Sequence, residues 1–278
     1  MIEKELSDSL FRKFSRLVYE TAGIHLHEGK KSLLQARLNK RLRATGIKTY
    51  KEYYKYIQDN PGEFINFLDA ISTNLTYFFR EPQHFEFLSK VALPEIISRK
   101  QDRGERRLRM WSAACSTGEE PYSMAMCTLE YLEENTPGVR WDFKILATDI
   151  STKVLQVAIR GQYSEERVSK VPPHLRNRFF KKVIVDGEKV YEVSPELKQI
   201  VAFRRLNLKE PYPFKGPFEV IFCRNVMIYF DKPTQQEILA RMVSYLAEGG
   251  YFFVGHSESL AGLKHDLKYV KPAVYQKK

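Results

Sequence analysis

From about residue 107 the chain alternates short apolar runs with amphipathic segments, and this alternation limits the possible folds more than any other feature. The runs 107–114 ("RLRMWSAA") and 141–151 ("WDFKILATDIS") have the length and apolar content of buried strands. The segments 119–135 and 151–161 have helical periodicity. Strands that alternate with helices predict an α/β fold, with a mostly parallel sheet joined by right-handed crossovers.

The same alternation returns towards the end of the chain. We expect a buried strand at 218–230, a helix stopped by two glycines at 232–250, a strand at 250–258 and a last strand at 267–278. The stretch 162–205 interrupts the pattern, because alternating runs flank Asp186-Gly187 as in a tight β-hairpin. We interpret 162–205 as a small β-rich insertion that continues in extended structure after Ser194.

The first 72 residues show no strand pattern and predict a small all-α domain. Leu34, Leu38 and Leu42, for example, recur at every fourth position of one predicted helix. We therefore divide the chain into an all-α domain (1–72), a connecting segment with a helix (73–106) and an α/β domain (107–278).

Composition bounds the class of protein. The chain has 278 residues, of which 43% are hydrophobic, enough for a packed core. We expect a cytoplasmic protein for three reasons. There is no signal peptide, there is no run of about 20 apolar residues that could span a bilayer, and the three cysteines lie far apart with no CxxC pair. The net charge of +11 indicates an acidic partner, either nucleic acid, an anionic membrane or an acidic protein surface. A basic surface that only serves solubility is the alternative.

Polar residues gather where the predicted strands end, which is where doubly wound sheets bind ligands. They are Ser112 to Glu120, Thr148-Asp149 and Arg224-Asn225. Asp149 is placed to accept hydrogen bonds from a ribose, and with Glu119 it makes an acidic pocket that suits the cationic cofactor S-adenosylmethionine. The glycine pattern of dinucleotide sites is absent.

These acids have an alternative interpretation as helix caps. The spacings Ser116 to Glu119 and Thr117 to Glu120 both fit a capping box, in which the glutamate only satisfies backbone amides. Asp149 could likewise cap the helix that begins near Ser151. Spacing alone does not choose between capping and ligand binding.

Five blocks of the sequence resemble the signature motifs of the CheR family, the glutamate methyltransferases of chemotaxis receptors. They are "TNLTYFFREPQHF" (73–85), "WSAACSTGEEPYSMAM" (111–126), "ILATDIS" (145–151), "FCRNVMIYFD" (222–231) and "GYFFVGHSESL" (250–260). The resemblance covers nearly the whole chain in order. It implies a Rossmann-like methyltransferase domain with a β-subdomain, preceded by an all-α domain.

The resemblance also implies roles for individual residues. Asn74, Thr76 and Glu119 match residues that bind the methionyl part of S-adenosylmethionine, and Asp149 matches the ribose-binding acid. Asn207 and Leu208 match the pair that flanks the adenine, and Arg224 with Asn225 matches a polar pair of the pocket. Arg80 matches a residue near the methionyl carboxylate and the methyl-transfer site, and Tyr229 matches the tyrosine that faces the acceptor. Without the resemblance, Arg80 and Tyr229 would be taken as surface and core residues.

The reaction implied is transfer of a methyl group to a glutamate carboxylate, which is already ionised near neutral pH and needs no general base. The implied partner is the cytoplasmic helical bundle of methyl-accepting receptors. Arg37, Lys40 and Arg43, broadly opposite the leucines of their helix, would form a basic face for it, and a solvated face is the alternative. In some family members the β-subdomain also binds a peptide at the receptor's C-terminus. We expect a monomer that neither binds nucleic acid nor inserts into the membrane.

Two other functions remain as alternatives. One is a non-catalytic sensor that binds S-adenosylmethionine or S-adenosylhomocysteine. The other is a nucleic-acid methyltransferase, against which stands "RNVMIY" in place of the Asn/Asp-Pro-Pro-Tyr/Phe motif of amino-methylases. No metal-ligand spacing is present, and we interpret His84 and His256 as structural residues, the latter at the border of the pocket.

Overall fold

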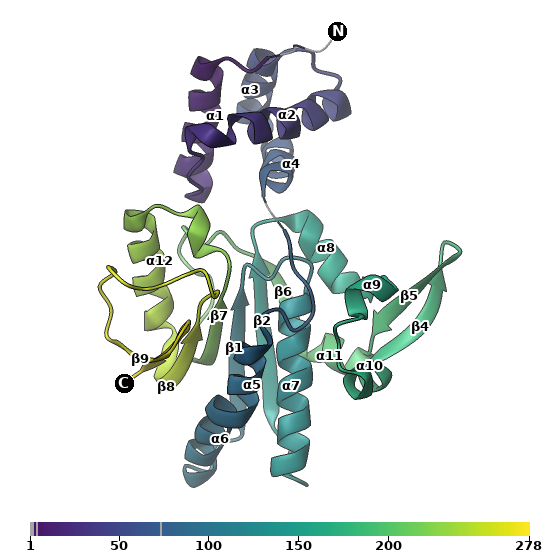
Figure 1. The fold of residues 1–278 in the computed structure, drawn as a ribbon, viewed down its shortest axis with the longest axis vertical. Helices are drawn as coiled ribbons and strands as arrows, with labels where there is room; N and C mark the ends of the chain where they lie inside the picture. Colours follow the sequence, from purple (N-terminus) through teal and green to yellow (C-terminus); the bar gives the residue numbers. More distant parts are fainter. Residues whose placement is uncertain (1–2, 4, 73) are drawn as a thin grey trace.

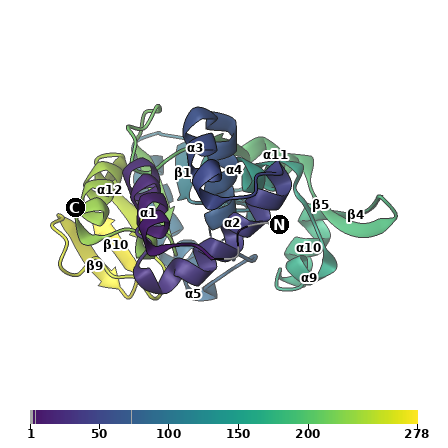
Figure 2. The same cartoon turned by 90° about the horizontal axis from the view of Figure 1, so that it is seen from above.

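The computed structural model describes residues 3, 5–72 and 74–278. Thr73, the first residue of the predicted connecting segment, lies outside this part. A helical domain lies over one end of an α/β domain, and a hairpin projects to one side (Figures 1 and 2). The fold is thus the predicted one.

The helical domain consists of α1 (Asp8–Ala22), a 3₁₀ turn η1 (Glu28–Lys30), α2 (Lys31–Thr45), α3 (Tyr50–Asp59) and α4 (Pro61–Ile71). Gly23 and Gly46 end α1 and α2 in the left-handed conformation, and the Thr49 side chain caps α3 by accepting a hydrogen bond from the Glu52 amide. Leu34, Leu38 and Leu42 are buried in the core of this domain, as predicted. The connecting segment then forms α5 (Pro82–Phe87), a π-helical turn η2 (Leu88–Ala92) and α6 (Leu93–Asp102).

The main sheet has seven strands in the order β6-β2-β1-β7-β8-β10-β9. Strands β6, β2, β1, β7 and β8 run parallel, and β10 is antiparallel to both of its neighbours. Their bounds are β1 (Arg107–Ala113), β2 (Asp142–Asp149), β6 (Val201–Arg205), β7 (Phe218–Cys223), β8 (Leu246–Phe253), β9 (Leu267–Lys271) and β10 (Val274–Lys277). The helices of this domain are α7 (Glu119–Asn135), α8 (Thr152–Arg160) and α12 (Lys232–Ser244), with a 3₁₀ turn η3 (Met227–Tyr229).

Three predictions in the C-terminal part were wrong in extent. Strand β7 ends at Cys223, because Asn225 takes a left-handed conformation that turns the chain out of the sheet. Helix α12 ends at Ser244, and the two glycines lie inside β8, where a Cβ atom on Gly250 would come within 2.9 Å of the Glu219 carbonyl oxygen. The predicted last strand is a hairpin of two strands, β9 and β10.

The insertion contains a second, antiparallel sheet in the order β3-β5-β4. Its elements are β3 (Gln162–Tyr163), α9 (Glu165–Val168), α10 (Pro173–Phe179), β4 (Phe180–Val185) and β5 (Glu188–Val193). Asp186 and Gly187 both have positive φ, as the predicted tight turn requires. The end of the range 162–205 differs from the prediction, because Pro195–Ile200 is a helix (α11) and Val201–Arg205 is the edge strand β6 of the main sheet.

Candidate active site

A cavity lies between the helical domain and the carboxyl ends of β1, β2, β6 and β7. The helical domain contributes apolar side chains such as Ile24, Leu33 and Ile71. The connecting segment and the α/β domain contribute the predicted site residues. Those that line the cavity are Asn74, Thr76, Arg80, Asp149, Asn207, Leu208, Arg224, Asn225 and Tyr229. The structure therefore brings together every predicted cofactor and acceptor residue except one.

The exception is Glu119, which does not line the cavity. It is fully buried on the other side of the turn, where one carboxylate oxygen lies 2.5 Å from Arg167 Nη2 and the other accepts a hydrogen bond of 2.7 Å from the Thr117 hydroxyl. Glu120 lines the cavity instead. Successive residues of a helix are rotated by about 100°, so neighbouring glutamates face different surroundings.

The capping-box interpretation of this turn is also wrong. Gly118 occupies the N-cap position of α7, and no side chain caps this helix. Ser116 donates its hydroxyl to the Asn74 carbonyl at 3.2 Å, across the cavity edge. Ser112 donates to Glu120 at 2.7 Å. Ser116 thus connects the turn to the 74–81 segment, and the side chains before α7 contact its glutamates without capping its backbone.

Asp149 joins two turns at the sheet edge. Its Oδ2 accepts a hydrogen bond from the Ser116 amide at 2.8 Å, and its Oδ1 accepts one from the Ser151 amide at 2.9 Å. Ser151 caps α8 through its own hydroxyl, so Asp149 is not the side-chain cap of that helix. Burial raises the pKa of Asp149 to about 6. A carboxylate has acceptor positions beyond these two, which fits the predicted contact with ribose hydroxyls.

Arg224 is the buried centre of the polar lining. Its guanidinium lies 2.9 Å from a Glu81 oxygen and 3.1 Å from a Glu120 oxygen. Burial raises the pKa of Glu120, against the opposing effect of Arg224. For Glu81, burial also acts to raise the pKa, but Arg224 and Asn225 outweigh it and the pKa is lowered. Sequence reasoning missed Glu81, and it considered Glu120 as a polar residue of the turn or a helix cap without giving it a binding role, although both lie inside the quoted blocks.

The backbone around the cavity is unusual. Five residues there adopt positive φ without being glycine: Phe79 (54°), Glu81 (59°), Ala114 (60°), Ser116 (50°) and Asn225 (57°). Such conformations cost free energy and concentrate at functional sites. Here they bend the 74–81 segment, the turn after β1 and the loop after β7 around one space.

Arg80 and Tyr229 lie at the edge of the cavity and are partly exposed. Arg80 donates to the Leu75 carbonyl at 2.7 Å, and the Tyr229 carbonyl accepts a hydrogen bond from the His25 amide at 2.8 Å. The Asn207 side chain donates to the Thr21 carbonyl at the end of α1, at 2.7 Å. Arg37, Lys40 and Arg43 do not line the cavity, and Lys40 and Arg43 are exposed on α2.

Comparison with known proteins decides the family. The CheR methyltransferase all-alpha domain matches residues 9–72, and the CheR methyltransferase SAM-binding domain matches residues 74–275. The chain belongs to the CheR methyltransferase family. The second match includes residues 74–106, which we set apart as a connecting segment.

The CheR relatives are similar over almost their whole length. The chemotaxis protein methyltransferase of Borreliella burgdorferi is 42% identical over 265 residues, which cover 94% of this chain and 92% of that protein. The chemotaxis protein methyltransferase of Escherichia coli is 42% identical over 273 residues, which cover 97% and 90%. Chemotaxis protein methyltransferase 2 of Pseudomonas aeruginosa is 43% identical over 266 residues.

Membership confirms the predictions of a methyltransferase, of its fold and of S-adenosylmethionine as its cofactor. The cavity fits this cofactor, because it is lined by the carboxylates of Asp149 and Glu120 and by apolar side chains. None of the helices in the described part of the chain is long and apolar enough to cross a membrane. The roles of the individual site residues stay predictions.

Proposed function

We propose that this CheR-family enzyme transfers the methyl group of S-adenosylmethionine to glutamate carboxylates of chemotaxis receptors, giving methyl esters. The observation that carries the proposal is the cavity itself. It places Asp149 and Glu120 beside Arg80 and Tyr229, at the carboxyl ends of the parallel strands and next to the helical domain. Carboxylates suit the positively charged donor, and the arginine suits an incoming carboxylate.

The cofactor supplies an electrophilic sulfonium methyl group, and the chain binds and orients it. Asp149, fixed by two backbone amides, accepts the ribose hydroxyls. Glu120, rather than Glu119, binds the methionyl amino group together with Asn74 and Thr76. Leu206 and Leu208 provide an apolar surface for the adenine. The Asn207 side chain is already bonded to α1, so it positions this surface.

The acceptor needs alignment more than activation. A glutamate side chain has a reference pKa of about 4.3, so it is ionised near neutral pH. Its oxygen forms the new bond to the methyl carbon as the carbon–sulfur bond breaks, which leaves a neutral ester and a neutral thioether. Arg80 and Tyr229 hold the carboxylate in line, and the cavity removes water from the two opposite charges.

Two surfaces outside the cavity suit the receptor. Arg37, Lys40 and Arg43 of α2 form a basic face for the acidic methylation region of a helical bundle. Strand β4 is an edge strand of the small sheet, and Ile184 on it is 72% exposed, which suits the addition of an extended receptor peptide. The enzyme works as a monomer in this scheme, without binding nucleic acid and without inserting into the membrane.

The test is incubation with methyl-labelled cofactor and receptor cytoplasmic fragments, followed by mass spectrometry of the receptor peptides. We expect alkali-labile methyl esters on glutamates. Label on DNA that resists alkali, with none on receptors, would instead support the nucleic-acid alternative. Tight binding of S-adenosylhomocysteine with no transfer to any receptor would support the sensor alternative.

A further inference from the structure

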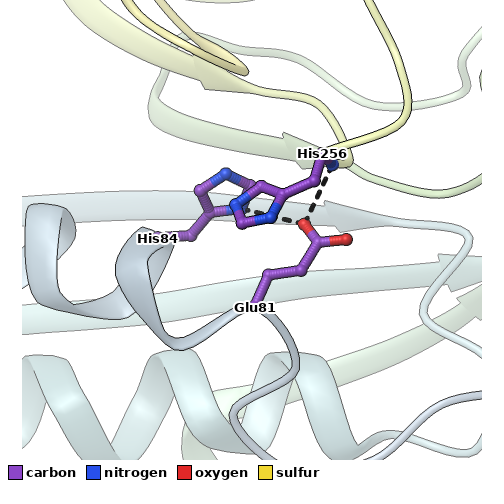
Figure 3. Close-up of side chains that lie close together, drawn as sticks. All are labelled: Glu81, His84 and His256. Atoms are coloured by element: carbon purple, nitrogen blue, oxygen red, sulfur yellow. Dashed lines mark hydrogen bonds and ion pairs between the residues drawn. The ribbon is translucent and has the colours of Figure 1, made fainter.

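Glu81, His84 and His256 form a cluster of side chains (Figure 3). None of the three lines the active-site cavity. Glu81 is the N-cap residue of α5 and His84 lies in the first turn of this helix, so the two side chains share one side. His256 follows β8. The cluster thus joins the connecting segment to the far end of the chain, which explains why sequence spacing did not indicate it.

The distances between the possible ligand atoms are close to those of a metal site, and a rotation of the His256 ring would complete it. Zinc binds imidazole nitrogen and carboxylate oxygen at about 2.0–2.2 Å, so two tetrahedral ligands lie about 3.4 Å apart. His84 Nδ1 lies 3.4 Å from Glu81 Oε2. The ligand atoms of all three residues lie within 4.8 Å of one another. His256 is exposed, and its ring can rotate to close the remaining gap.

His84 is the second observation that indicates a ligand. Its side chain is buried, with 0% exposure, yet neither ring nitrogen has a hydrogen-bond partner among the described residues. Buried polar groups are nearly always satisfied, so an orphaned imidazole calls for a partner that protein atoms do not supply. Burial lowers the pKa of His84 to about 3, which leaves the ring neutral, the form that binds metals.

We propose that Glu81, His84 and His256 bind a divalent transition-metal ion, specifically Zn²⁺. Two imidazole nitrogens and one carboxylate oxygen provide three ligands of a tetrahedral ion, and water provides the fourth. Phe253 packs edge-to-face against the His84 ring, with centroids 5.6 Å apart, and holds its orientation. Glu81 is held by Asn225 and by the His256 amide, both at 3.2 Å. These contacts support the ligands from outside the site.

The site is coupled to the active-site cavity through Glu81. The Glu81 oxygen that faces His84 is the same one that Arg224 contacts at 2.9 Å. A bound cation competes with Arg224 for this oxygen. It is also repelled by the positive charges of Arg224 and Lys271. Arg224 and Asn225 line the cavity, so a metal ion that displaces Arg224 from Glu81 disturbs the cavity lining and weakens cofactor binding. By linkage, the cofactor weakens metal binding to the same degree.

The experiment measures metal binding directly on the full chain. Zn²⁺ is titrated in competition with a chromophoric chelator, and Co²⁺ is added separately to record the visible absorption of a four-coordinate site. We expect one strong site in the wild type. The variant His256→Ala changes an exposed side chain and should fold, with Zn²⁺ affinity lowered at least about tenfold and the Co²⁺ absorption lost.

The matched control is His174→Ala, which removes an exposed histidine on α10 that pairs with Glu130. It should leave Zn²⁺ binding unchanged. A second readout is calorimetry with S-adenosylhomocysteine, whose affinity should fall when Zn²⁺ is present in the wild type but not in His256→Ala. Equal Zn²⁺ affinity in the wild type and in His256→Ala would overturn the proposal, whether or not receptors are the substrate.

Discussion

At the scale of single residues, the candidate active site and the turn beside it contain carboxylates whose surroundings differ sharply. Glu119 is paired with an arginine of the insertion, Glu120 faces the cavity, and Asp149 holds two backbone turns together. Sequence reasoning identified the acidic turn and Asp149. Of the two adjacent glutamates it chose Glu119, whereas Glu120 lines the cavity, because the residue that faces the cavity depends on the rotation of α7 after the turn at Gly118.

Replacing Asp149 tests the ribose contact. We expect Asp149→Ala to weaken binding of S-adenosylhomocysteine by about 1–3 kcal/mol, because a charge-assisted hydrogen bond is lost. Isothermal titration calorimetry measures the change. The control is Asp186→Ala at the hairpin tip, which should bind normally. An unchanged affinity in Asp149→Ala would show that the ribose lies elsewhere.

The pH dependence of cofactor binding follows from the same residue. Burial raises the pKa of Asp149 to about 6, so the carboxyl is protonated below that value and loses acceptor capacity. Affinity for S-adenosylhomocysteine should therefore fall as the pH drops through about 6. The effect of this titration on folding has the opposite direction. Because the pKa of Asp149 is raised from 3.8 to about 6 in the folded state, its ionisation lowers the free energy of unfolding as the pH rises through this range.

Calorimetry between about pH 5 and about pH 7.5 checks this titration. Asp149→Asn cannot ionise and should show a flat affinity over the same range. If the wild type is equally flat, Asp149 either does not titrate there or does not touch the cofactor.

At the scale of elements, periodicity located the helices and most strands, and its errors have physical causes. Apolar residues continue beyond Cys223 because the segment after β7 packs at the cavity, with Met227 and Phe230 buried and Ile228 exposed, so a partly buried loop was predicted as strand. The glycines in β8 were taken as a helix stop, although Gly250 allows close approach to Glu219 of β7 and Gly249 lies against the Arg99 side chain of α6. Strand β6 was assigned to the insertion, because sheet membership depends on long-range pairing with β2.

Helix α2 carries the predicted receptor-facing charges. The double variant Arg37→Glu with Lys40→Glu should lower kcat/KM for receptor methylation by roughly tenfold or more, since it reverses the charge that attracts an acidic partner. Affinity for S-adenosylhomocysteine should stay the same, because neither residue lines the cavity. Lys51→Glu on the neighbouring helix α3 serves as control. Equal rates in the double variant and the control would mean that α2 does not meet the receptor.

Helix α9 connects the insertion to the turn between β1 and α7. Arg167 donates to the Thr117 hydroxyl at 2.7 Å and pairs with the fully buried Glu119. We expect Arg167→Ala to lower the free energy of unfolding by about 1–3 kcal/mol, because Glu119 keeps its burial and loses its partner. Urea denaturation measures this. Arg167→Lys should recover part of the lost free energy of unfolding. An unchanged free energy of unfolding in Arg167→Ala would show that the ion pair with Glu119 contributes nothing to stability.

At the scale of the whole molecule, the two domains are joined by many contacts around the cavity. Lys209 donates its ammonium to the Tyr19 and Glu20 carbonyls at the end of α1, where a cation is favourable, and Tyr19 donates to Asp231 at 2.8 Å. Ile24 forms a β-bridge with Phe230. None of these contacts could be predicted from sequence, because each joins segments that are distant in the chain.

The net charge of +11 predicts a salt effect on the whole reaction. Raising the ionic strength should lower kcat/KM for the receptor, because the Debye length shrinks from about 10 Å at 0.1 M salt to about 3 Å at 1 M. Binding of S-adenosylhomocysteine, which occurs inside the cavity, should change much less. Initial rates and calorimetry over a salt series separate the two effects, and a salt-independent kcat/KM would exclude electrostatic steering.

The placement of the cavity between the domains constrains how such a chain can be varied. Its floor comes from the parallel strands and its roof from Ile24, Leu33 and their neighbours. Exchanging the helical domain for that of a distant relative therefore replaces one side of this cavity along with the proposed receptor-facing surface. In the proposed scheme, receptor preference and affinity for S-adenosylmethionine therefore change together, and a variant designed to alter one must also restore the other.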